Sequence, residues 1–154
     1  MMGVREQRRC ILLRWEAKDA LAFQDTGEYV DTAIVPMIQL NPNTPVPSAA
    51  HAEYVQMVSY GLEKQLKGRI MLFPPVTYFE DQTPVIAHWT GNLKKVGFSH
   101  VAYLGAKGMS IDGSALRLGV PDIPLETMDE TYKQKLAGDQ VQQLLQALVK
   151  HWNT

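Results

Sequence analysis

Short apolar segments alternate with longer segments of helical periodicity, and this alternation constrains the fold more than any other feature of the sequence. Apolar runs typical of buried strands lie at residues 32–40, 69–73, 100–104 and 115–120. Between them, residues 48–66 and 83–96 repeat apolar side chains at the spacing of one helix face. Such short joints between strand and helix are typical of βαβ units. We therefore predict an α/β fold, a three-layer sandwich with a mainly parallel sheet of about four strands flanked by helices.

Glycine, proline and capping residues mark where these helices begin and end. The first helix is expected to end at Gly68, because glycine tolerates the left-handed backbone that closes a helix. The second is expected to begin with Thr83 as N-cap and Pro84 in the first turn, where a missing N–H costs nothing. Two further helices are predicted, at residues 16–30 ahead of the first strand and at residues 129–151 after the last one.

Pro36 stands inside the first strand, AIVPMIQL, and is the residue there that opposes a regular sheet. Proline has no backbone N–H to donate to a neighbouring strand, so in sheets it is found mainly at bulges and on edge strands. We therefore expect a bulge or a sheet edge at Pro36.

Length and composition indicate one domain with a substantial core. The chain has 154 residues, of which 45% are hydrophobic, and a chain of this size hides about two-thirds of its unfolded surface on folding. We assign residues 14–154 to a single α/β domain. Residues 1–13, rich in arginine, are expected to form a flexible basic N-terminal extension.

Charge and cysteine content exclude several classes of partner and cofactor. The 15 basic and 16 acidic residues leave a net charge of −1, so we expect no general attraction to nucleic acid or anionic lipid. Cys10 is the only cysteine, which excludes an internal disulfide and a multi-cysteine metal site. No apolar run approaches the roughly 20 residues of a membrane-spanning helix. We expect a cytoplasmic protein without a transmembrane segment, and a homo-oligomer is compatible with this composition.

Polar residues gather in the loops that are expected at the carboxyl ends of the strands. Open parallel sheets bind ligands beyond those ends. The candidate ligand-binding residues are Asn41, Asn43, Thr77, Tyr78, Glu80, Asp81 and Lys107. The partner is expected to be a small anionic ligand, bound by a lysine and by backbone N–H groups in a glycine-bounded loop, or another protein.

Each candidate also has a purely structural interpretation. Lys107 lies in the stretch GAKG, which is typical of tight turns and lacks the spacing of a P-loop. Asn41 and Asn43 stand among prolines, where asparagine often bonds its own backbone. Glu80 and Asp81 precede a predicted helix, and stabilising its positive end is a more common role for such carboxylates than acid–base catalysis.

Motifs for catalysis and metal binding are absent from the sequence. No two of the histidines have the i, i+4 spacing of a helical metal site; they are His51, His88, His100 and His151. The stretch GxSxG is absent, and no Ser-His-Asp or Cys-His arrangement can be assembled from motifs. We therefore predict no catalytic residue, no bound metal and no cofactor.

Three stretches carry a resemblance to a known family. They are EYVDTAIVPMIQL at residues 28–40, MLFPPVTYF at residues 71–79 and GFSHVAYLG at residues 97–105. Together they resemble the YpiF-like family of uncharacterised proteins from spore-forming Gram-positive bacteria, over roughly residues 14–151. The resemblance implies a cytosolic single domain with no assigned reaction. It also implies genes that often lie near those of a quinol–cytochrome c reductase.

A second resemblance concerns the layout of a metal centre. FPPVTYF, followed by a helix and GFSHVAYLGAKG, is similar to creatininase-type amidohydrolases, in which a strand after a GF helix end leads to an asparagine–glycine–histidine–glycine loop of the metal centre. Lys107 stands where that family needs its histidine, and the first strand ends in IQLNPN, without the glutamate–histidine pair of metal ligands. A protonated lysine cannot bind a metal, so the resemblance implies a shared fold with a dismantled metal site.

Three functions of different classes remain open. The first is a non-catalytic ligand-binding or regulatory module that uses the carboxyl ends of the strands. The second is a degenerate creatininase-like hydrolase or transferase for a small metabolite, with Glu80 or Asp81 as base and Lys107 as electrostatic stabiliser. The third is an assembly factor that docks on a respiratory complex through exposed apolar residues. The missing motifs favour the first.

Overall fold

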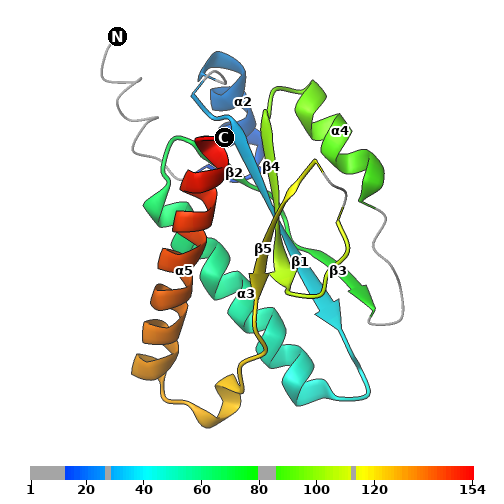
Figure 1. Cartoon of the computed structure of the whole chain (residues 1–154), viewed down its shortest axis with the longest axis vertical. Coiled ribbons are helices and arrows are strands. Elements are labelled where there is room, and N and C mark those ends of the chain that lie inside the picture. The colour runs from blue at the N-terminus through cyan, green and yellow to red at the C-terminus, as the bar shows by residue number, and fades with distance from the viewer. Residues whose placement is uncertain (1–12, 27–28, 80–85, 112–113) are drawn as a thin grey trace.

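The computed structural model describes residues 13–26, 29–79, 86–111 and 114–154. Within these residues, five strands form one sheet with helices on both faces (Figure 1). The elements in chain order are α2 (Ala17–Thr26), β1 (Thr32–Leu40), α3 (Pro45–Gln65), β2 (Ile70–Leu72), β3 (Val76–Phe79), α4 (Ala87–Lys95), β4 (His100–Ala106), β5 (Leu116–Val120), the 3-10 turn η1 (Leu125–Thr127) and α5 (Glu130–Trp152). The predicted α/β fold is confirmed, with one strand more than predicted.

Strand β1 occupies the centre of the sheet. The strand order is β2-β1-β4-β5, and β3 also pairs with β1. All of these pairs are parallel. The first seven residues of β1 are buried, as its nearly continuous apolar sequence requires of a strand covered on both faces. The predicted mainly parallel sheet is therefore confirmed.

Strands β2 and β3 lie end to end along the same side of β1. Ile34 pairs with Leu72 in β2, and Met37 pairs with Val76 in β3. Between these two pairs, two residues of β1 (35–36) lie opposite three residues of the segment that joins β2 to β3 (73–75). Strands β2 and β3 are therefore one strand interrupted by a bulge of one extra residue.

Pro36 faces this bulge. The oxygen of Ile34 accepts from the N–H of Phe73 at 2.9 Å, and alternate residues of a strand turn their backbone groups to the same neighbour. The missing N–H of Pro36 therefore points to the interrupted part of the neighbouring strand, where it removes no regular ladder bond. The predicted bulge is confirmed, although its extra residue lies on the neighbouring strand and β1 itself is central.

The two faces of the sheet carry different helices. Ile34 and Ile38 belong to the apolar core under α3 and α5, whereas Val35 and Met37 pack under α4. A third cluster, in which Phe23 of α2 contacts buried residues, covers the amino end of that second face. This alternation along β1 makes the three layers of the sandwich.

The domain begins earlier than the predicted boundary at residue 14. Leu13 is buried, and its oxygen accepts from the N–H of Leu72 at 3.0 Å. The assignment of residue 13 to the flexible extension is therefore wrong, because this residue pairs with the edge of β2. Residues 1–12 lie outside the described part of the chain.

Helix α3 begins three residues ahead of the predicted start at residue 48. Thr44 is its N-cap residue and Pro45 opens the first turn, where proline has the required φ and no N–H to satisfy. Helix α4 is described from Ala87 onward. The predicted cap residues Thr83 and Pro84 lie outside the described residues.

Candidate functional site: a polar pocket at the strand ends

A polar pocket of about 250 Å³ lies at the carboxyl end of β1. Its walls come from the end of this strand, the first turns of α3 and the segment that follows β5. The lining residues are Gln39, Asn41, Thr44, Pro47, Ser48, His51 and Asp122. We call it the strand-end pocket, and it lies where open parallel sheets bind their ligands.

Asn41 builds the turn that leads from β1 into α3. Its side-chain Oδ1 accepts from the N–H of Asn43 at 3.2 Å, and its backbone oxygen accepts from the N–H of Thr44 at 3.1 Å. Its own N–H donates to Ser48 Oγ at 3.0 Å. This is the local backbone bonding that asparagine favours in turns. Asn43 does not line the strand-end pocket, whereas Asn41 does.

The start of α3 offers few donors to an anion. Pro45 and Pro47 have no N–H, and the N–H of Ser48 already donates to the oxygen of Thr44 at 3.1 Å. Helix N-termini bind anions through free N–H groups. The prolines remove these groups, so the helix start does not form an anion cradle here.

His51 is the most buried polar side chain of the strand-end pocket, with 7% of its side chain exposed. Its Nε2 accepts from the backbone N–H of Gln39 at 3.3 Å. A neutral imidazole that accepts at one nitrogen carries its proton on the other. Burial lowers the pKa of His51, against the opposing influence of Asp122. At neutral pH the ring is therefore uncharged and presents an Nδ1–H group.

Asp122 lies across the strand-end pocket from this N–H. The distance from His51 Nδ1 to Asp122 Oδ1 is 4.0 Å, and the carboxylate is 96% exposed. This distance is too long for a direct hydrogen bond. One hydroxyl oxygen about 2.8 Å from both atoms fits between them, accepting from the imidazole and donating to the carboxylate.

Two predicted site residues lie in a strand that the sequence did not indicate. Thr77 and Tyr78 belong to β3, which pairs with β1, so the prediction that these two residues lie in a loop is wrong. The pairing with β1 makes the strand, since the segment VTYF is too short to show a period of its own. Tyr78 packs against the core under α4, and burial raises its pKa.

Among the charged candidates, Lys107 does not line the strand-end pocket. Lys107 is exposed, and its Cγ lies 3.0 Å from the position that a Cβ on Gly119 would take. The N–H of Met109 donates to the oxygen of Ala106 at 3.1 Å, which closes a tight turn around Lys107. Glu80 and Asp81 lie outside the described residues.

The sequence contained signals for the residues that were missed. Ser48 and His51 are three positions apart in a helix and so lie on one face. Asp122 lies two positions after the end of β5, at the same end of the sheet as the predicted loops. Because ligands bind beyond the carboxyl ends of parallel strands, the loop after β5 also belongs to the candidate site, and this reasoning would have added Asp122 to the predicted residues.

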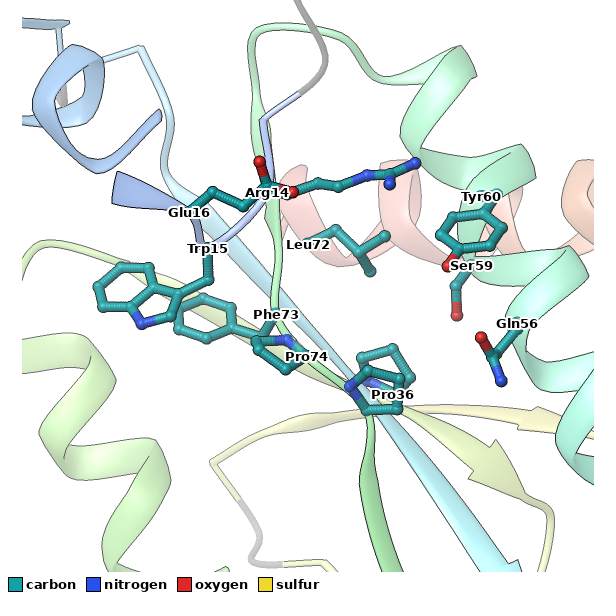
Figure 2. Close-up of a pocket in the computed structure, with 11 residues that line it drawn as sticks. Arg14, Trp15, Glu16, Pro36, Gln56, Ser59, Tyr60, Leu72, Phe73 and Pro74 are labelled. Atoms are coloured by element: carbon teal, nitrogen blue, oxygen red, sulfur yellow. The ribbon is translucent and has the colours of Figure 1, made fainter. Parts of the chain in front are cut away.

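A second pocket, of about 220 Å³, lies beside the bulge, between α3 and the segment that precedes α2 (Figure 2). Its lining residues are Arg14, Trp15, Glu16, Pro36, Gln56, Ser59, Tyr60, Leu72, Phe73, Pro74 and Pro75. We call it the bulge pocket. On the other face of the sheet, a groove of about 390 Å³ runs along the same bulge against α4. Neither feature could be predicted, because both depend on how β2 and β3 pair with β1.

Comparison with known proteins identifies the family. A family model described as "Protein of unknown function (DUF2487)" matches residues 21–152. The chain belongs to this family. It is similar to "Uncharacterized protein YpiF" from Bacillus subtilis (strain 168), with 30% identity over 148 residues, 92% of this chain and 99% of the relative. No solved structure matches the chain significantly.

The predicted resemblance to the YpiF-like family is thus confirmed for this DUF2487 protein. Neither comparison supports the similarity to creatininase-type amidohydrolases. Within the described ranges, no three His, Cys, Asp or Glu side chains are grouped so as to hold a metal ion. In the same part of the chain, no helix has both the length and the apolar character that crossing a membrane requires.

Proposed function

We propose that this DUF2487 protein is a non-catalytic binding module that takes a small, hydroxyl-bearing ligand in its strand-end pocket. The observation that carries the proposal is the geometry of His51 and Asp122. The imidazole Nδ1 and the carboxylate oxygen are 4.0 Å apart. A donor and an acceptor at this separation match one hydroxyl group, which both donates and accepts.

The hydrogen bonds around His51 support binding without catalysis. Ser48 and Thr44 supply hydroxyl groups to the strand-end pocket, and a hydroxyl nucleophile such as Ser48 needs a base that accepts its proton. His51 Nε2 already accepts from the N–H of Gln39, and Nδ1 carries the ring proton. Neither nitrogen is therefore available as a base for Ser48 in this arrangement.

The charge of the strand-end pocket favours an uncharged ligand. Among the described residues that line it, Asp122 is the one that is charged at neutral pH, since burial lowers the pKa of His51. A negative charge at the rim disfavours anions. The small anionic ligand predicted from Lys107 would require a different place on the surface, near the turn that follows β4.

A thermal-shift screen tests the proposal, because a ligand that binds only the folded protein raises the melting temperature. The compounds are neutral polyols and sugars, sugar phosphates, nucleotides and divalent metals. We expect neutral hydroxylated compounds to raise the melting temperature of the parent protein. Asp122→Asn, whose amide oxygen is a weaker acceptor than the carboxylate, should reduce the shift, and Glu126→Gln, which removes an exposed carboxylate on η1 outside the pocket, should preserve it.

Several outcomes would contradict the proposal. One is that no neutral hydroxylated compound shifts the melting temperature, and another is an equal shift in Asp122→Asn. Chemical conversion of a bound compound, followed by NMR, would contradict the absence of catalysis. A shift produced by a phosphorylated compound and lost in Lys107→Ala would favour the anionic ligand instead.

One observation favours the alternative of a docking partner. The groove along the bulge is almost entirely apolar, and its lining residues are Val35, Phe73, Pro74, Pro75, Val76, Trp89, Asn92 and Leu93. Open apolar surfaces of this kind commonly mark protein interfaces. If the protein assists a respiratory complex through this groove, Asn92→Arg should abolish co-purification with quinol–cytochrome c reductase. Asn92 is exposed, so the change should leave the melting temperature unaltered.

A further inference from the structure

The bulge pocket forms where the proline of β1 lies opposite prolines of the segment that joins β2 to β3. Pro36 in β1 and Pro74 and Pro75 between β2 and β3 have no backbone N–H. The ladder bonds that would draw the two strands into a regular sheet cannot form between prolines. The walls at this level are therefore apolar rings without donors. A polar molecule that needs many hydrogen bonds would find few there.

Aromatic rings face the bulge pocket from two sides. Trp15 is stacked on Phe73, with ring centroids 4.7 Å apart, and Phe73 packs edge-on against Phe98 at 5.5 Å. Tyr60 on α3 lies on the other side together with Gln56, as Figure 2 shows. Trp15 is 46% and Tyr60 41% exposed. Two large rings thus stay exposed even though each is held by a fixed neighbour.

Arg14 supplies a cationic hydrogen-bond donor to the bulge pocket. Its Nε and Nη2 donate to the two carboxylate oxygens of Glu63, each at 2.9 Å, and its guanidinium lies 4.7 Å from the Tyr60 ring centroid. Glu63 is 1% exposed, whereas the Arg14 side chain is 42% exposed. A guanidinium has five N–H groups. Within the described residues, the three that do not bond Glu63 make no other hydrogen bond to the protein.

We propose that the bulge pocket binds an uncharged molecule with one planar ring and a carbonyl-type acceptor. The ring would lie against the prolines beside Tyr60, and the acceptor would bond Arg14. A cavity of about 150 Å³ holds a benzene molecule, so the 220 Å³ here accommodates one substituted ring. Glu63 neutralises the guanidinium and Glu16 adds a negative charge at the rim. A carboxylate therefore gains no net attraction, whereas a neutral carbonyl keeps its hydrogen bond.

A purely structural role accounts for only part of this arrangement. The bidentate pair of Arg14 and Glu63 fastens the segment before α2 to α3, and that explains why the buried carboxylate has a partner. It does not explain the open space beneath the pair. It also leaves the exposed faces of Trp15 and Tyr60 without a role.

The test compares benzamide with benzoate, which have the same ring and differ in charge. Binding to the full chain is measured by NMR, through saturation transfer to each compound and through the indole N–H signal of Trp15. We expect benzamide to bind more tightly than benzoate. Tyr60→Ala should weaken benzamide about tenfold by removing one aromatic wall. Tyr132→Ala, which removes an exposed tyrosine of α5 away from the pocket, should leave the affinity unchanged.

Gln56→Ala provides a second variant in case Tyr60→Ala does not fold, and it too should weaken benzamide. Asp122→Asn, in the strand-end pocket, should have no effect, which separates this proposal from the proposed function. Failure of benzamide to bind the parent protein would overturn the proposal. So would unchanged affinity in both Tyr60→Ala and Gln56→Ala, tighter binding of benzoate than of benzamide, or an equal loss in Asp122→Asn.

Discussion

Trp152, at the end of α5, donates its indole N–H to Oγ1 of Thr32, at the start of β1, over 2.9 Å and across 120 positions of the chain. The Thr32 hydroxyl in turn donates to Asp31 Oδ1 at 2.9 Å. Arg69 lies over the Trp152 ring, 3.6 Å from its centroid, and bonds both oxygens of Asp31 at 3.2 and 3.3 Å. This network attaches the last helix to the amino end of the sheet. The strand-end pocket lies at the opposite end.

We predict that Trp152→Phe lowers the free energy of unfolding by about 1–2 kcal/mol. The change removes one partly buried hydrogen bond and some ring volume, while a ring remains under Arg69. Urea unfolding followed by circular dichroism measures the effect. In the double variant with Thr32→Val, the cost of losing the indole N–H should shrink, because its acceptor is already gone. Full additivity of the two changes would show that this hydrogen bond does not stabilise the protein.

The elements that follow from local signals were predicted closely. Strand β1 has the predicted bounds at residues 32–40, because its run of apolar residues ends at asparagine and proline. Helix α5 begins at Glu130 after the N-cap Asp129, whose side chain accepts from the N–H of Tyr132 at 2.8 Å. Such N-caps can be predicted from the sequence, because a short polar residue stands directly before the helix.

The elements that depend on distant partners were not predicted from the sequence. Strand β3 is four residues long and follows two prolines, and only its pairing with β1 makes it a strand. The strand-end pocket shows the same limit. Asn41 was identified from its place after a strand, but the role of His51 depends on Gln39, twelve positions earlier in the chain. A short-range sequence pattern does not predict a hydrogen bond between a side chain and the backbone of another element.

The absence of a side chain at Gly105 is predicted to stabilise the contact between β4 and β1. A Cβ there would lie 2.7 Å from the oxygen of Met37 and 3.2 Å from Sδ of Met109. Gly105→Ala should therefore cost about 1–3 kcal/mol in the free energy of unfolding, as overpacking in a core does. Gly108→Ala is the matched control, because no atom lies within 4 Å of the added Cβ. Equal stability of the two variants in urea would contradict this close contact.

Arg14→Leu is predicted to destabilise the protein because it leaves the buried carboxylate of Glu63 without a partner. Breaking a fully buried pair costs about 3–5 kcal/mol. Here we expect about 2–3 kcal/mol, since Arg14 is 42% exposed and water screens part of the interaction. Urea unfolding measures the loss in this variant and in the double variant Arg14→Leu/Glu63→Leu.

The double variant decides how the loss arises. If the uncompensated charge causes it, replacing Glu63 as well should restore most of the stability, because an apolar pair can take the place of an ion pair. A double variant as unstable as Arg14→Leu would assign the loss to packing of the arginine side chain on Tyr60 instead.

The stability of the protein is predicted to fall as the pH drops below about 6.5, and His51 is expected to cause part of this fall. Burial lowers the pKa of His51 in the folded state below its ordinary value of about 6.5, and burial lowers that of His100 as well. Between the lowered pKa and 6.5, the unfolded chain binds more protons than the folded one. Protons therefore favour unfolding in this window, and the stability is fully present only above it.

Urea unfolding of the parent protein and of His51→Gln at about pH 7.5 and about pH 5.5 tests this assignment. The difference in the free energy of unfolding between the two pH values should be smaller in His51→Gln, because glutamine does not titrate. Protonation of His51 also removes the acceptor for the N–H of Gln39, so NMR should show that amide signal moving as the pH passes through the lowered pKa of the folded state. His88→Gln is the control, because it removes one exposed histidine and should leave the pH dependence of the parent protein unchanged. If His51→Gln kept the full pH dependence of the parent, the imidazole in the strand-end pocket would not be the proton-sensitive group.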